Sequence, residues 1–162
     1  MYVTTLSSPL GTLHLASDGT ALTGLWMEGQ KYFASTLPPE IIEKKDLSVF
    51  RQTEEWLRAY FAKAPLPALP PLRPEGSPFR QAVWALLQEI PCGQTRTYGA
   101  LTQELKAMGI PAAPQAVGGA VGHNPISILI PCHRCLGADG SLTGYAGGLE
   151  KKKFLLELEG AL

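Results

Sequence analysis

The stretch Ile126–Cys135 reads Ile-Ser-Ile-Leu-Ile-Pro-Cys-His-Arg-Cys, and the rest of the chain is best understood from it. Its apolar half predicts a buried strand that ends at Pro131. Cys132 follows at once, with His133 and Arg134 behind it, so the thiol leaves an apolar segment and enters a cationic one. A neighbouring His or Arg favours the thiolate, which is the nucleophilic form. The other interpretation is a small buried cysteine beside a surface His-Arg pair, because free cysteine is among the most buried residue types.

The composition predicts a globular protein without a marked charge preference. The 162 residues carry 14 Lys and Arg against 14 Asp and Glu, and the charges also balance within residues 1–74 and within residues 75–162. Residues 92–134 hold three basic residues and one acidic residue. This small excess of basic residues is only weak evidence for nucleic-acid binding, so any DNA-binding surface must be a local patch.

The cysteines are Cys92, Cys132 and Cys135. An odd number of cysteines without a secretory N-terminus argues for a reducing cytosol rather than a disulfide scaffold. No apolar run approaches the ~20 residues that a helix needs to span a bilayer. We therefore expect a cytoplasmic protein with no membrane partner.

The first half of the chain predicts a small α/β domain. Short strands over residues 2–6 and 11–16, with a tight turn at Asp18-Gly19, favour an antiparallel meander. Residues 47–62 place apolar side chains at helical spacing, which predicts an amphipathic helix. The proline-rich segment 64–74 favours an extended connector. We place the domain boundary there, with domains over residues 1–70 and 71–162; the alternative is a rigid loop inside one domain.

Three helix signals follow the connector. Ser77-Pro78 predicts a helix start, because serine caps the first turn and proline suits the first helical position. Thr97 can cap a second helix, which ends near residue 109. A third helix is expected over residues 114–124, where three glycines cost about 1 kcal/mol each relative to alanine. The second and third helices resemble a helix-turn-helix unit, although tight packing of the third helix on the core would explain the same glycines.

The remaining segments complete a set of reactive groups. A glycine-rich loop over residues 140–149 lacks the spacing of phosphate-binding loops, so we expect it to cover a pocket. A last helix is expected over residues 151–159. The chain thus offers the Cys132 thiol, the His133 imidazole, the Tyr98 phenol and the Glu159 carboxylate, which are parts of activated-nucleophile chemistry. Spacing alone does not bring these groups together.

The second half resembles the O6-alkylguanine-DNA alkyltransferases, also called methylated-DNA–protein-cysteine methyltransferases. The likeness runs from about Ser77 to Gly160, whereas the first half is only loosely similar, as a ribonuclease-H-like domain. The resemblance implies an N-terminal α/β domain, with a small antiparallel sheet plus a helix, followed by a mostly α, winged-helix-like C-terminal domain with a helix-turn-helix. The motifs that carry it are Pro131-Cys132-His133-Arg134, Ala116-Val117-Gly118-Gly119-Ala120 and Gly144-Tyr145-Ala146-Gly147-Gly148.

The resemblance implies DNA repair by alkyl transfer from O6-alkylguanine, and from O4-alkylthymine, to the protein's own cysteine in a single turnover. Cys132 would be the nucleophile, His133 would take its proton through a water, and Glu159 would orient His133. Tyr98 would protonate the leaving guanine and crowd the phosphate so that the nucleotide rotates out. The implied partner is double-stranded DNA, bound by a monomer in the minor groove with base flipping. No cofactor is implied.

The resemblance also implies residues that bind substrate or DNA. Asn124 would tie the recognition helix to the active-site strand, and Tyr145 and Ala146 would line the base pocket. Residues with small side chains would let the recognition helix enter the narrow minor groove. The remaining members of this set are Gln115, Ala116, Gly118, Gly119, Arg134 and Cys135.

Three features depart from the family pattern. Gln115 stands where an arginine often replaces the rotated nucleotide in the DNA helix; glutamine can hydrogen-bond the orphaned base but brings no charge. Cys135 stands where valine is usual. The family uses the backbone carbonyl there to hold guanine, and the cysteine creates a Cys-x-x-Cys motif. No ligand set for a structural zinc is visible, so we predict no metal.

Three other functions compete with this interpretation. Cys-x-x-Cys could be a redox dithiol, but such motifs usually open a helix in a βαβ unit. A helix-turn-helix regulator would need no thiol near the recognition helix, and this slim helix lacks side chains that read base edges in the major groove. A non-reactive relative that only flags lesions would lack the cysteine.

Overall fold

The computed structural model describes residues 1–162, which divide into two compact units. The first unit contains Met1–Glu75 and the short segment Pro125–Ser127, and the second contains Gly76–Asn124 and Ile128–Leu162. Residues 71–75, which the sequence-based boundary placed in the second domain, lie in the first unit. The reason is local pairing: the Leu22 N–H donates to the Pro71 carbonyl and the Arg73 N–H to the Leu22 carbonyl, both at 2.8 Å.

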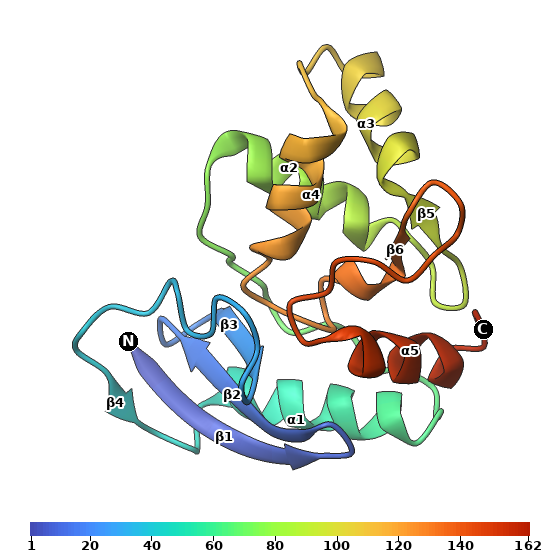
Figure 1. Ribbon diagram of the computed structural model, residues 1–162. Helices are drawn as coiled ribbons and strands as arrows, with labels where there is room; N and C mark the ends of the chain where they lie inside the picture. The colour runs from blue at the N-terminus through green and yellow to red at the C-terminus, as the bar shows by residue number, and fades with distance from the viewer. The chain divides into compact units, whose positions relative to one another are not determined.

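The first unit is a four-stranded sheet with one helix along it (Figure 1). Strands β1 (Tyr2–Ser8), β2 (Gly11–Ser17) and β3 (Leu22–Met27) form the expected antiparallel meander. The two-residue strand β4 (Ile42–Glu43) pairs in parallel with β1 and is too short to leave a periodic signal. Helix α1 (Ser48–Phe61) is amphipathic, as predicted. The residues it buries are Val49, Phe50, Thr53, Trp56, Leu57 and Tyr60.

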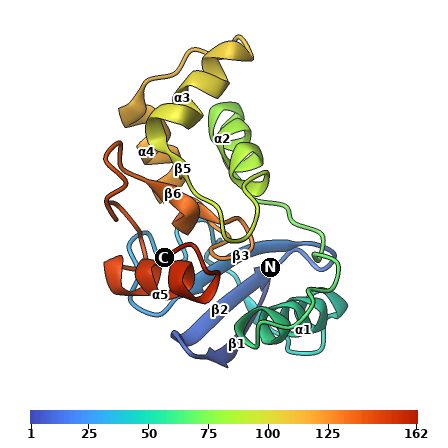
Figure 2. The ribbon, with the colours of Figure 1, turned by 90° about the vertical axis from the view of Figure 1, so that its right-hand side faces the viewer.

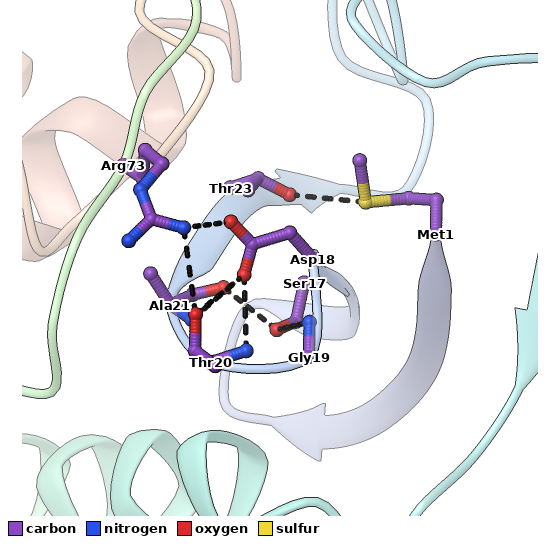
Figure 3. Close-up of polar contacts among 8 residues, drawn as sticks. All are labelled: Met1, Ser17, Asp18, Gly19, Thr20, Ala21, Thr23 and Arg73. Atoms are coloured by element: carbon purple, nitrogen blue, oxygen red, sulfur yellow. Dashed lines mark hydrogen bonds and ion pairs between the residues drawn. The ribbon is translucent and has the colours of Figure 1, made fainter.

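Asp18 organises the turn between β2 and β3 (Figure 3). One carboxylate oxygen accepts hydrogen bonds from the Thr20 N–H at 3.0 Å, the Ala21 N–H at 2.9 Å and the Thr20 hydroxyl at 3.1 Å. Gly19 takes the left-handed backbone that this turn requires, with a φ of 108°. The other carboxylate oxygen pairs with the Arg73 guanidinium. The backbone hydrogen bonds, more than the arginine, hold the pKa of Asp18 well below its usual range.

The second unit is mostly helical (Figure 2). It contains α2 (Pro78–Gln88), α3 (Tyr98–Ala107), α4 (Pro114–Gly122) and α5 (Leu149–Leu158), with the short strands β5 (Arg96–Thr97) and β6 (Cys135–Leu136) paired in parallel. Figures 1 and 2 both show α2, α3 and α4 gathered at one end of this unit and α5 at the other.

Local signals start two of these helices as predicted. The Ser77 hydroxyl accepts the Arg80 N–H at 3.3 Å with proline at the first helical position, and the Thr97 hydroxyl accepts the Ala100 N–H at 3.0 Å. The indole N–H of buried Trp84 donates to the Ala120 carbonyl at 2.8 Å, which ties α2 to α4. No helix is both long enough and apolar enough to cross a membrane.

The apolar run before Cys132 is not the strand we predicted. Ile126 makes one isolated bridge, residues 127–129 form a turn, and Ile128 has a left-handed φ of 72°. Pro125 and Pro131 flank the run, and each lacks the N–H that a strand ladder needs. The apolar side chains of this run are nevertheless buried. The apolar pattern therefore predicted their burial correctly, but the prediction of a strand was wrong.

Candidate active site

Cys132 opens a short 3-10 helix, Cys132–Arg134, and is only 4% exposed. Burial raises the pKa of the Cys132 thiol, while a hydrogen bond with the Asn124 side chain and the charge of Lys152 act in the opposite direction. The Asn124 amide also donates to the Ile130 carbonyl at 2.8 Å. Asn124 therefore connects the end of α4 to the segment that carries the cysteine.

His133 is completely buried and bound to an acid. Its Nε2 lies 2.6 Å from the Oε2 of Glu159, the residue that ends α5. Burial lowers the pKa of His133, although Glu159 opposes the shift. A neutral ring that donates its Nε2–H to Glu159 leaves Nδ1 as an acceptor. That Nδ1 is buried and has no hydrogen-bond partner in the protein.

Arg134 belongs to the same cluster. Its Nε and Nη2 donate to the two oxygens of Glu159 at 2.8 and 3.0 Å, and its Nη1 donates to the Ile90 carbonyl at 2.6 Å. Only 8% of the residue is exposed. This placement does not support the DNA contact expected for Arg134. It also corrects the idea that two cations beside Cys132 favour the thiolate, because Arg134 is paired with Glu159 and burial keeps His133 neutral.

Lys152 also belongs to the cluster around Cys132, and sequence reasoning missed it. Its ammonium group is buried and donates to the Cys135 carbonyl at 2.5 Å and the Thr143 carbonyl at 2.8 Å. The three lysines at residues 151–153 had no role predicted from the sequence. However, residues three and four positions later on the helix, Leu155 and Leu156, are buried, and such neighbours share a face. That spacing was the signal that could have identified it.

Tyr98 and the glycine-rich loop form a second part of the site. The Tyr98 hydroxyl lies 3.2 Å from the Thr143 and the Gly144 carbonyl oxygens, either of which can accept its proton. Burial raises the pKa of Tyr98, so the phenol stays protonated. Gly144 has a φ of 63°, and a Cβ there would lie 3.3 Å from the Tyr98 hydroxyl. A side chain at residue 144 would therefore disturb this contact.

The same loop brings Tyr145 against His133. The two rings meet edge to face, with centroids 6.5 Å apart, and Tyr145 is 9% exposed. Ala146 follows and is half-buried. The glycine-rich loop thus contacts the His133 imidazole through Tyr145, and it contacts the Tyr98 phenol through the carbonyl oxygens of Thr143 and Gly144.

The outer face of helix α4 carries mostly small side chains. Gln115, Ala116 and Gly119 are exposed, Gly118 is half-buried, and Val117 faces the core. A Cβ added at any of the three glycines of α4 would meet nothing within 4 Å. Packing within the chain therefore does not require these glycines, which removes the main support for the core-packing interpretation.

The fold and the site define a class of protein: an α/β domain joined to a helical domain with a helix-turn-helix and a buried cysteine-histidine-glutamate cluster. The 6-O-methylguanine DNA methyltransferase, DNA binding domain, matches residues 78–161, and the ribonuclease-like domain of the same proteins matches residues 1–74. The chain belongs to the family of methylated-DNA–protein-cysteine methyltransferases. The family and the two-domain fold class predicted from the sequence are confirmed.

Individual relatives are similar over nearly the whole chain. The methylated-DNA–protein-cysteine methyltransferase of Haemophilus influenzae is 44% identical over 160 residues, which cover 98% of this chain and 86% of the relative. The methyltransferase of the same name from Methanosarcina acetivorans is 44% identical over 162 residues, which cover 99% of this chain and 99% of the relative. The structure is similar to that of Mycobacterium tuberculosis OGT in complex with DNA, with a TM-score of 0.85 and 42% identity over 99% of this chain and 94% of that one.

Proposed function

We propose that this protein repairs DNA by transferring an alkyl group from the O6 of guanine to Cys132, once per molecule. Family membership and the names of the relatives support this class of reaction. The observation that carries the choice of acceptor is the buried cluster around Cys132. Glu159 holds one nitrogen of the neighbouring imidazole, and Nδ1 of His133 has no other partner in the protein.

The proposed chemistry begins with proton transfer from Cys132 to Nδ1 of His133 through a water. Glu159 stabilises the resulting imidazolium, and Arg134 fixes both oxygens of Glu159. The thiolate attacks the alkyl carbon in line with the carbon–oxygen bond, whose electrons pass to the guanine. Tyr98, which burial keeps protonated, supplies the proton to the leaving base. The thioether that forms has no leaving group, which accounts for a single turnover.

The proposed substrate is double-stranded DNA that carries O6-alkylguanine or O4-alkylthymine. A thiol this buried cannot reach a base inside the stack, so the nucleotide must rotate out, at a cost of a few kcal/mol. Because the outer face of α4 carries mostly small side chains, this helix can enter the narrow minor groove. Gln115 would take the place of the rotated nucleotide in the DNA helix.

Tyr145 and Ala146 would line the base pocket in this proposal. The Cys135 carbonyl can contact guanine while it accepts from Lys152, because a carbonyl oxygen has two lone pairs. We further propose that the protein acts as a monomer in the cytoplasm.

Mass spectrometry tests the proposal directly. The protein is incubated with duplex DNA that contains one O6-methylguanine, and the intact protein and its peptides are weighed. We expect at most one added methyl per molecule, located on Cys132. A methyl on Cys92 or Cys135 would show that the wrong acceptor was chosen.

The variant Cys132→Ala completes this test. We expect it to stay folded and to bind DNA, but to take up no methyl group. If this variant fails to fold, the residue has a structural role and its loss says nothing about transfer. Peptide mapping of the unsubstituted protein then remains the deciding measurement.

A further inference from the structure

Cys132 and Cys135 are two buried thiols separated by one tight turn. The Cys135 N–H donates to the Cys132 carbonyl and so closes the 3-10 turn. Side chains three residues apart in such a turn lie over one another. The Cα atoms across a turn of this size are less than about 7 Å apart, and disulfides bridge Cα atoms about 4.4–6.8 Å apart. Both thiols are free in the structure.

The two thiols also share their surroundings. Lys152 interacts electrostatically with both of them, and so does the Tyr98 phenol. Burial raises the pKa of Cys135 to about 12, the charge of Lys152 opposes the shift, and Cys132 adds a smaller contribution that raises it further. Both thiols therefore lie within electrostatic range of the same Lys152 ammonium and the same Tyr98 phenol. The third cysteine, Cys92, is exposed and interacts with Glu159 and Arg134 instead.

We propose that Cys132 and Cys135 form a reversible intramolecular disulfide, which masks the alkyl acceptor under oxidising conditions. The disulfide itself rests on the turn geometry, whereas its effect on repair rests on the proposed function. Alkylation consumes Cys132 permanently, but a disulfide returns it to use when a reductant is present. The motif then regulates the acceptor and is not a separate redox activity.

The oxidant we name is a small-molecule disulfide, such as oxidised glutathione. The Cys132 thiolate attacks one of its sulfurs, the sulfur–sulfur bond breaks, and one glutathione thiolate leaves. Cys135 then gives its proton to the glutathione thiolate already released and attacks the Cys132 sulfur of the mixed disulfide, which releases the second glutathione. The two protein thiols are oxidised to one disulfide, and the reagent is reduced to two thiols.

The experiment treats the reduced protein with oxidised glutathione, blocks free thiols with iodoacetamide, and weighs the intact protein and its peptides without reductant. We expect a product that lacks two hydrogen atoms, with Cys132 joined to Cys135 and Cys92 alkylated. Methyl uptake from O6-methylguanine DNA should fall at least tenfold in this product. Dithiothreitol should restore it.

Two variants serve as matched controls. Cys92→Ser should form the internal disulfide as the unsubstituted protein does. Cys135→Val should form no internal disulfide and should either stay reduced or carry one glutathione on Cys132. The proposal is overturned if the disulfide involves Cys92, or if Cys132 of the unsubstituted protein keeps a glutathione that Cys135 does not displace.

The readouts separate this proposal from the proposed function. If the reduced protein takes up a methyl but no internal disulfide forms, the disulfide proposal alone fails. If the internal disulfide forms but the reduced protein takes up no methyl, the proposed function fails and the disulfide remains.

Discussion

Lys152 lies between two other lysines on α5, yet its side chain is buried while that of Lys153 is exposed. A cation in a desolvated site acts more strongly on nearby charges than one in water. The positive charge of Lys152 favours the Cys132 thiolate, against the burial that disfavours it. Its two hydrogen bonds also join the glycine-rich loop to Cys135.

We predict that Lys152→Met raises the pKa of Cys132 and slows its alkylation. Each unit by which the pKa of Cys132 rises lowers the thiolate fraction tenfold at neutral pH, so we expect alkylation to slow in proportion to that rise. The measurement is the rate of reaction with iodoacetamide as a function of pH, with mass mapping to follow Cys132 separately. The profile should move to higher pH.

Lys153→Met is the matched control, because that lysine is exposed and makes only a long ion pair with Glu157 at 3.8 Å. Its pH profile should equal that of the unsubstituted protein. A folded Lys152→Met protein with an unshifted profile would mean that Lys152 only holds the loop.

The residues of the site differ in how well the sequence could predict them. The roles proposed for His133 and Glu159 came from resemblance, since 26 residues separate them and no local rule brings them together. Arg134 was misjudged because an arginine next to a cysteine does not reveal which carboxylate it will meet. The spacing to Leu155 and Leu156 could have indicated that Lys152 is buried, but the carbonyls that it binds are 9 and 17 residues away and no local rule identifies them.

At the level of elements, α4 combines a poor helix composition with an uncrowded outer face. Its glycines cost helix stability, and the structure offers no internal neighbour that needs them. A helix of this kind is explained if a partner approaches its backbone closely, as the proposed DNA contact requires.

We predict opposite effects on stability and DNA binding for substitutions at Gly119. Gly119→Ala should raise the free energy of unfolding by up to about 1 kcal/mol, because alanine favours the helix and meets open space. Gly119→Leu should also fold, but should bind lesion DNA much more weakly than Gly119→Ala. Urea denaturation and fluorescence anisotropy measure the two effects. Equal DNA affinity for the alanine and leucine variants would exclude this face of α4 from the interface.

The turn held by Asp18 leads to a prediction about pH. The pKa of Asp18 is lowered from 3.8 in the folded state, so its contribution to stability is complete above about pH 4 and declines as the pH falls below that value. Asp18→Ala should therefore lower the free energy of unfolding at pH 7 by about 1–2 kcal/mol. The difference from the unsubstituted protein should shrink in acid.

Urea denaturation at several pH values checks this expectation. Asp46→Ala, which changes an exposed aspartate outside the turn, is the control and should show little effect. A difference for Asp18→Ala that stays constant down to pH 2 would contradict the proposed role of the charge.

Elements set by local chemistry were predictable, and those set by distant partners were not. The Ser77 and Thr97 caps lie within three residues of the groups they bind, so their sequence signals were sufficient. The strand β4 and the turn over residues 127–129 depend on chain segments that are far away in sequence. For the turn, the apolar pattern indicated only that the side chains would be buried.

At the scale of the whole molecule, the connector between the two units is exposed in its first part and hydrogen-bonded to a strand in its last part. Residues 62–69 are exposed and have no regular structure beyond the end of α1. From Pro71 to Arg73 the backbone pairs with Leu22. The prolines predicted an extended segment, but only the partner strand determines where the free part ends.

We predict that a short Gly-Ser insertion between Pro67 and Ala68 is tolerated. Doubling the length of a flexible loop costs only about 0.6 kcal/mol, so the free energy of unfolding should change by no more than that. The same insertion between Leu72 and Arg73 should be clearly more destabilising, because it interrupts the pairing with Leu22. Urea denaturation compares the two, and equal effects would place the boundary elsewhere.

The hydrogen bond from Trp84 to Ala120 has a practical consequence. The Trp84 indole belongs to α2 but donates its N–H to the backbone of α4, so it is an intrinsic fluorophore that reports on the contact between the two helices. With Trp26 and Trp56 replaced by phenylalanine, all tryptophan emission would come from this ring, so any displacement of α4 could be followed in real time without a dye.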